Sequence, residues 1–178
     1  VVVEKGVTKI GSSAFKDCQA LVSASIASGV KEIGDKVFSG CVSLEKVNIP
    51  KGVKSIGVEL FFQCASLENV TLPEGVNDIW ESAFRLCVSL KKINIPASVQ
   101  HIGPFVFENC LSMEKITVAS GNKNYASRDG VLYSVDPSTK KLTTLLKCPG
   151  GKSGSVTVAK GVTGIDQAAF ENCLGVTA

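Results

Sequence analysis

Residues 44–66 read LEKVNIPKGVKSIGVELFFQCAS, and the apolar positions of this stretch return every 23 residues along the chain. Several columns of a single residue type share this spacing, which chance does not produce. The columns are Val7, Val30, Val53, Val76 and Val99; Ile10, Ile33, Ile56, Ile79 and Ile102; Phe15, Phe38, Phe61, Phe84 and Phe107; and Cys18, Cys41, Cys64, Cys87 and Cys110. The chain is therefore predicted to be a stack of repeated turns, because one such unit cannot bury its apolar face alone.

Each repeat unit divides into two halves with different periods. Val47 and Ile49 alternate with polar residues, which is the spacing of a strand, and Pro50 ends that strand. In the second half Phe61 and Cys64 lie three residues apart, on one side of a single helical or 3-10 turn. We expect a parallel β-sheet on the concave face of the stack and short helical or 3-10 turns on the other face.

The repeat predicts about seven coils of 23 residues within a single domain that covers 1–178. The units lie near 1–20, 21–43, 44–66, 67–89, 90–112, 113–152 and 153–178. The unit 113–152 is longer than the others, and its segments 131–135 and 141–146, separated by Asp136-Pro-Ser-Thr-Lys140, predict one β-hairpin insertion at about 122–154. This hairpin either widens the sheet locally or forms a binding protrusion. Neither end has a polar cap, so we expect a fragment of a longer array.

The pattern I-P-x-G-V-x-x-I-G-x-x-x-F-x-x-C-x-S-L, carried by 49–67 and its neighbours, resembles the BspA-like class of leucine-rich repeats. The predicted fold is thus an α/β right-handed leucine-rich-repeat solenoid. The family occurs in surface and secreted proteins of anaerobic and host-associated bacteria and of some parasitic protists, and several members are implicated in adhesion to host matrix proteins or to other cells. The resemblance implies an extracellular or cell-surface location, although no export signal is visible in this chain.

Composition argues against several other functions. The net charge is only +3 and no basic cluster dominates the sequence, so we expect no nucleic-acid partner. His101 is the single histidine and Cys-x-x-Cys is absent, so no catalytic residues, metal site or cofactor are predicted. The chain has no run of about 20 apolar residues, so we expect no direct membrane insertion of this segment. Six cysteines, including Cys173, should form a reduced, inward-facing row, whereas Cys148 lies in a loop and is the one thiol expected to be exposed or paired.

The candidate binding residues lie in two outward-facing columns of the predicted concave sheet. One column continues from Ser23 and the other from Ser25, and together they supply Lys46, Asn48, Asn69, Thr71, Lys92, Asn94, Lys115 and Thr117. They form either a solvated sheet face or a mildly basic, hydrogen-bonding surface for a protein or glycan. Trp80 replaces a recurring glycine and is either an edge residue or a contact anchor.

These observations favour a non-enzymatic recognition or adhesion module of a cell-surface or secreted protein. Its partner would be a host or partner-cell protein, such as a matrix protein, or a glycan, bound through the concave face. The alternative is a structural spacer array that displays other domains.

Overall fold

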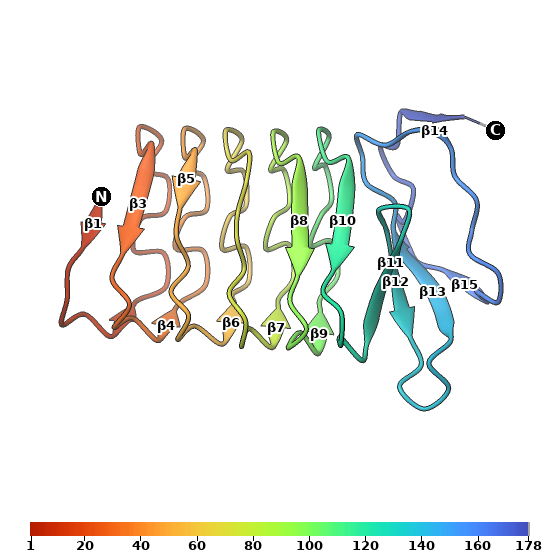
Figure 1. Cartoon of the computed structure of the whole chain (residues 1–178). Helices are drawn as coiled ribbons and strands as arrows, with labels where there is room; N and C mark the ends of the chain where they lie inside the picture. Colours follow the sequence, from red (N-terminus) through yellow and green to blue (C-terminus); the bar gives the residue numbers. More distant parts are fainter. Residues whose placement is uncertain (178) are drawn as a thin grey trace.

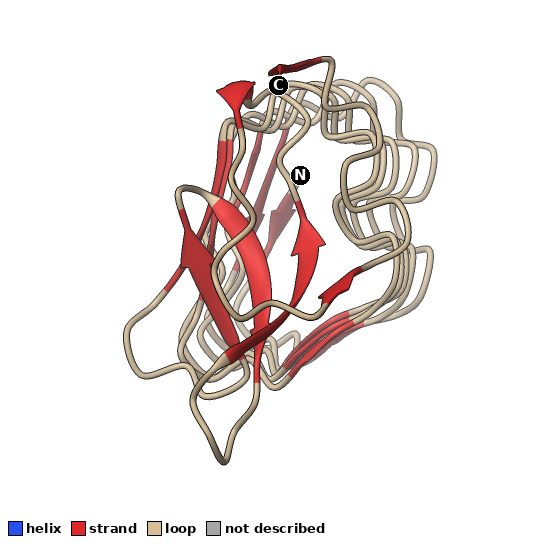
Figure 2. Ribbon diagram, turned by 90° about the vertical axis from the view of Figure 1, so that its right-hand side faces the viewer, coloured by secondary structure: helices blue, strands red, loops and turns tan. Residues whose placement is uncertain are grey.

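The computed structural model describes residues 1–177, and the chain forms a parallel β-solenoid (Figures 1 and 2). It winds through about eight turns of about 23 residues, close to the seven that the sequence periodicity predicts. Successive turns lie side by side between the two ends of the chain (Figure 1). The view along the stack shows the turns superposed around a common interior (Figure 2).

One row of strands carries the candidate columns. This first strand row comprises β1 (Val2–Val3), β3 (Ser23–Ile26), β5 (Lys46–Val47), β8 (Lys92–Ile95) and β10 (Lys115–Val118). Its pairs are parallel with a step of 23 residues, so Ser23 pairs with Lys46 and Lys92 with Lys115. Between β5 and β8 the pairing narrows to a single bridge from Asn69 to Lys92. The first strand row is therefore a parallel sheet that is interrupted in its middle.

A second strand row runs along the lower edge of the stack in Figure 1. It comprises β2 (Lys9–Ile10), β4 (Glu32–Ile33), β6 (Ser55–Ile56), β7 (Asp78–Ile79) and β9 (His101–Ile102). Each strand has two residues, with the first side chain directed outward and the isoleucine toward the interior. The sequence pattern did not predict these strands, because two residues are too few to display an alternating period.

Repeated residues fill the interior in columns. The rings of Phe38, Phe61 and Phe84 stack with centroid separations of 5.7 and 5.4 Å, and all three side chains are fully buried. Fully burying one such side chain stabilises a protein by about 1.5–3 kcal/mol, and a lone turn could not supply the neighbours. The column architecture inferred from the sequence is thus the architecture of the core.

The half of each turn that contains the phenylalanine differs from the prediction. Residues 1–177 contain no helix. In this half of each 23-residue solenoid turn, the backbone instead makes consecutive tight β-turns. Two residues in each turn have a positive φ, such as Glu59 at 51° and Gln63 at 59°. A helical ladder cannot pass through such residues, so alternate N–H groups bond to the next turn instead: Phe38 N donates to Leu60 O at 3.0 Å, and Phe61 N to Ala83 O at 2.8 Å.

The insertion is a three-stranded antiparallel unit. The predicted hairpin is confirmed by the antiparallel pairing of β12 (Val131–Val135) with β13 (Leu142–Lys147). A further strand, β11 (Tyr125–Arg128), precedes it and was not predicted. The turn between β11 and β12 requires Gly130, whose φ is +77°, and a Cβ there would approach the Cβ of Lys115 to 2.9 Å.

The chain returns to the solenoid after the hairpin. β13 pairs in parallel with β15 (Gly164–Ile165), and β14 (Ser153–Ser155) pairs in parallel with β16 (Gly175–Thr177). The insertion thus joins the stack through its last strand.

Two cysteines lie in positions that differ from the sequence prediction. Cys148 was expected in a loop, exposed or paired, but it is fully buried and its thiol is free. Its N–H donates to Ala169 O at 2.8 Å, as Phe84 N donates to Val106 O in a regular turn. Cys148 therefore occupies the phenylalanine position of the insertion turn. Cys18 was expected to face inward but is exposed. In the described structure the first turn is covered by a neighbouring turn on one side only.

Candidate functional site

The structure brings six of the predicted binding residues together on the first strand row. They line a hollow of about 190 Å³, with Val70, Leu72 and Ile93 at its floor. Its polar residues are Asn69, Thr71, Lys92, Asn94, Lys115 and Thr117. A wider depression of about 670 Å³ adjoins it and includes Lys46 and Glu68. Residues from three consecutive turns thus share one surface because the parallel register aligns them.

The lysines of this surface have no carboxylate partner within residues 1–177. The ion pairs involve other cations, such as Lys91 with Glu68 at 2.9 Å, and none includes Lys46, Lys92 or Lys115. Lys92 and Lys115 lie directly opposite each other in the parallel pair. Like charges at such positions are destabilising. An anion bound between them would relieve this repulsion.

Two of the predicted residues are partly engaged within the protein. Asn48 accepts a hydrogen bond from Ile26 N at 2.7 Å and donates one to Ile26 O at 2.8 Å. β5 ends at Val47, so the main-chain hydrogen bonds of the strand stop there. The two side-chain hydrogen bonds of Asn48 take their place. Thr117 donates to Asn94 at 2.9 Å across neighbouring strands. Asn48 lies at the boundary of the surface as a backbone clamp.

Trp80 lies outside the first strand row. It follows β7 and is 42% exposed, and its ring centroid is 5.0 Å from that of His101 in the next turn. It occupies the column of Gly34, Gly57 and Gly103. This exposed pair of rings forms a second surface, separate from the hollow of the first strand row.

The thiol row is buried and chemically quiet. Cys41, Cys64, Cys87 and Cys110 are free, and each donates from Sγ to the carbonyl of a phenylalanine in the preceding turn at 3.1–3.2 Å. Burial raises the pKa of Cys41 to about 11 and that of Cys110 to about 12. These thiols are therefore protonated at neutral pH, and a protonated thiol is a poor nucleophile.

Residues 1–177 contain no group of three or more His, Cys, Asp or Glu side chains arranged to hold a metal ion. In the same residues there is no helix of the length and apolarity needed to cross a bilayer.

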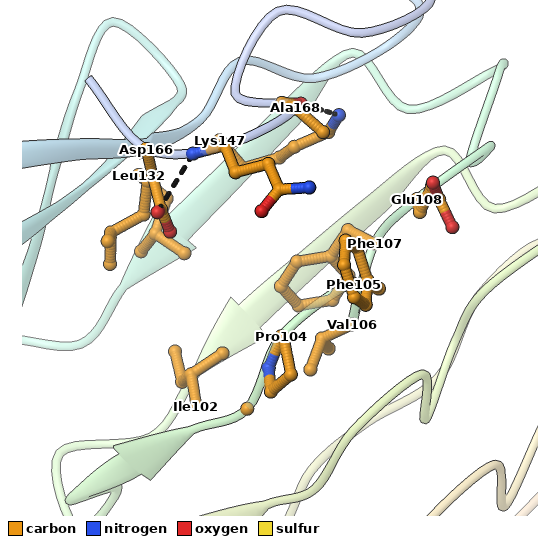
Figure 3. Close-up of a pocket in the computed structure, with 13 residues that line it drawn as sticks. Ile102, Pro104, Phe105, Val106, Phe107, Glu108, Leu132, Lys147, Asp166 and Ala168 are labelled. Atoms are coloured by element: carbon orange, nitrogen blue, oxygen red, sulfur yellow. Dashed lines mark hydrogen bonds between the residues drawn. The ribbon is translucent and has the colours of Figure 1, made fainter.

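A small cavity, of about 70 Å³, lies where the insertion turn meets the regular stack (Figure 3). Phe105 and Phe107 form one wall, and Leu132, Asp166 and Ala168 lie across from them. Lys147 Nζ donates to Ala168 O at 2.9 Å and to Glu171 O at 3.2 Å, which ties the insertion to the last turn. A volume of about 70 Å³ gives room for a few water molecules only, so we assign this cavity no ligand.

Solved structures share this architecture. A leucine-rich cell surface protein of Faecalibacterium prausnitzii is 33% identical with a TM-score of 0.80, and the match covers 94% of this chain and 43% of that protein. The pneumococcal vaccine antigen PcpA is 25% identical with a TM-score of 0.81, and the match covers 95% and 41%. A T. pallidum leucine-rich repeat protein is 24% identical with a TM-score of 0.76, and the match covers 99% of this chain and 77% of that protein. This similarity shows the fold alone.

This chain spans less than half the length of the first two proteins. No curated protein sequence matches it. Six copies of the BspA type leucine-rich repeat region match residues 1–128. The chain therefore belongs to the BspA-type leucine-rich repeat family.

Proposed function

We propose that this chain is a non-enzymatic recognition module of a cell-surface or secreted protein, and that it binds an acidic segment of a partner protein through the first strand row. The observation that carries the proposal is the register of Lys92 and Lys115 above the hollow, without a carboxylate partner among the described residues. Asn69, Asn94 and Thr71 surround the lysines and supply hydrogen-bonding groups. A carboxylate-bearing strand laid across the hollow would satisfy both kinds of group.

Family membership and the similar structures support the surface location. One similar protein is described as a cell surface protein and another as a vaccine antigen. Residues 1–178 would act as one repeat domain of a longer protein, whose partner is a host or neighbouring-cell protein such as a matrix component. Trp80 and His101 supply a second contact area at the edge of the stack.

The test is a double charge reversal, Lys92→Glu with Lys115→Glu, measured as binding to an immobilised oligo-glutamate peptide. We expect binding to weaken about tenfold, because each exposed charge pair contributes about 0.2–1 kcal/mol and reversal replaces attraction by repulsion. The matched control is Lys5→Glu with Lys160→Glu, which changes the net charge equally at two exposed residues outside the hollow. Binding should also weaken with added salt.

Two outcomes would contradict the proposal. Equal losses in both double variants would indicate an effect of net charge alone. Binding of heparin in place of the peptide, with the same dependence on Lys92 and Lys115, would assign the surface to a sulfated glycan.

The second candidate function is a structural spacer. The unbroken stacking of Phe15, Phe38, Phe61, Phe84 and Phe107, with neighbouring centroids 5.4–5.9 Å apart, supports a regular, stiff rod. A spacer would bind neither probe, and Lys92→Glu with Lys115→Glu would leave surface adhesion of the full-length protein unchanged.

A further inference from the structure

We propose that Cys148 and Cys173 form an oxidisable thiol pair, a disulfide site that links the insertion turn to the last turn of the solenoid. The proposal rests on the position of these two side chains in the core and is independent of the function proposed for the first strand row.

The pair exists because Cys148 stands in the insertion turn at the position where the regular turns have a phenylalanine. In regular turns the thiol of one cysteine lies over a phenylalanine of the preceding turn, as Cys110 Sγ lies 3.1 Å from Phe84 O. Cys148 holds this phenylalanine position in the insertion turn, and Cys173 Sγ lies 3.4 Å from Cys148 O and 3.5 Å from Pro149 O. A second thiol thus lies where regular turns place a phenyl ring.

Both side chains belong to one small apolar cluster, and Cys173 Sγ lies beside the main chain of Cys148. Burial, and after it the neighbouring thiol of Cys173, raises the pKa of Cys148 to about 12. The insertion therefore places a second thiol beside the cysteine column, at the position where a regular turn has a phenylalanine.

Access to the pair comes from Cys173. Its side chain is partly exposed, whereas Cys148 and the row from Cys41 to Cys110 are buried. Both cysteines belong to the small apolar cluster of the last turns, together with Tyr133 and Leu145. An oxidant in solution would reach Cys173 first and Cys148 only through it.

The chemistry requires a low-molecular-weight disulfide as oxidant. The thiolate of Cys173 attacks one sulfur of the oxidant, which forms a mixed disulfide and releases the first small thiolate. Cys148 then loses its proton to solvent, and its thiolate attacks Cys173 Sγ and expels the second small thiolate. The protein loses two protons and two electrons, and one oxidant molecule takes them up and becomes two thiols. The product closes the loop 148–173.

The experiment uses the full chain carrying Cys18→Ser, which removes the exposed thiol. After incubation with oxidised glutathione at mildly alkaline pH, we expect peptide mapping to find one reducible bridge between Cys148 and Cys173. The bridged protein should melt several degrees higher than the protein kept in dithiothreitol, because the cross-link restricts the unfolded chain.

Two variants make the result specific. In Cys148→Ala the second step cannot occur, so a stable glutathione adduct should accumulate on Cys173. In Cys110→Ala, the matched control from the same row, the bridge should form as before. A glutathione adduct on Cys173 without a bridge when Cys148 is present, a bridge between any other two cysteines, or no reaction at all would overturn the proposal.

Discussion

The thiol of Cys87 lies 3.1 Å from the main-chain carbonyl oxygen of Phe61, in the preceding turn. The same contact recurs from Cys41 to Phe15 and from Cys64 to Phe38. The repeated cysteine therefore has two physical roles: it fills a small space in the core, and its thiol gives a second hydrogen bond to a carbonyl that already accepts one from the main chain, as Phe61 O does from Cys64 N at 3.1 Å. Neither role needs reactivity, which agrees with the raised pKa of each buried thiol.

Removal of one such thiol should weaken the fold. We expect Cys87→Ala to lower the free energy of unfolding by about 1–2 kcal/mol, because the substitution leaves a small cavity and removes the hydrogen bond of the thiol to Phe61 O. Chemical denaturation provides the measurement. Cys18→Ala, at the exposed end of the same column, should leave the free energy of unfolding unchanged, and an equal loss in both variants would refute the explanation.

The buried thiols also predict alkaline instability. The pKa of Cys41 rises from 9.0 to about 11 on folding, so the native state retains a proton that the unfolded state releases. The resulting stabilisation is complete below pH 9 and is lost as the pH rises toward about 11. Melting temperatures across this range should fall, and they should fall less steeply in Cys41→Ala. A parallel decline in the two proteins would count against a thiol origin.

The stacked rings should dominate the stability of the central turns. Phe61→Ala removes a fully buried ring from the middle of the column and should cost about 3–5 kcal/mol. Phe105 is 38% exposed and serves as the comparison, with a smaller expected loss of about 1 kcal/mol for Phe105→Ala. Urea denaturation of both variants tests this difference, and similar losses would show that exposure does not govern the effect.

The glycine column tests how closely neighbouring turns approach. A Cβ on Gly103 would lie 2.7 Å from Glu81 N and 3.1 Å from the carbonyl carbon of Trp80, so Gly103→Ala must displace backbone. We expect a loss of about 1–3 kcal/mol. A Cβ on Gly11 would meet no atom within 4 Å, and Gly11→Ala should be neutral or slightly stabilising in the same thermal assay. A tolerated Gly103→Ala would show that the turns can separate.

Asn48 and Asn69 should separate structural from binding contributions on one surface. Asn48→Ala leaves Ile26 N and Ile26 O without their side-chain partner and should cost about 1–3 kcal/mol of stability. Asn69→Ala should leave the melting temperature unchanged and weaken binding of the oligo-glutamate peptide, because Asn69 lines the hollow. The opposite assignment of effects would show that Asn48 is not a backbone clamp.

The sequence predicted the columns and the face of the sheet because both depend on side-chain identity at a fixed period. Lys92 and Lys115 could be aligned from their spacing alone, and the register confirms that alignment. The role of Asn48 could not be predicted, because it depends on where β5 ends and on which backbone groups of Ile26 are then left free.

The turn half was misjudged because a spacing of three residues fits both a helical turn and consecutive β-turns. A partial signal was present: one column holds Asp17, Gly40, Gln63, Leu86, Asn109 and Asn172, and four of these six are Asp, Asn or Gly, which favour a positive φ. Cys148 could not be placed, since the insertion has no partner unit from which to read its register.

Along the phenylalanine column, the backbone hydrogen bonds between turns point one way along the stack. N–H groups of one turn donate toward the following turn, as Phe38 N does to Leu60 O and Phe84 N to Val106 O. Each turn therefore presents different groups to its two neighbours along this column: N–H donors face the following turn, and carbonyl acceptors face the preceding one. A duplicated or deleted segment preserves the bonding only if it comprises one whole turn in the same direction. Gain and loss of complete 23-residue units is thus the route by which such a protein can change length without changing fold.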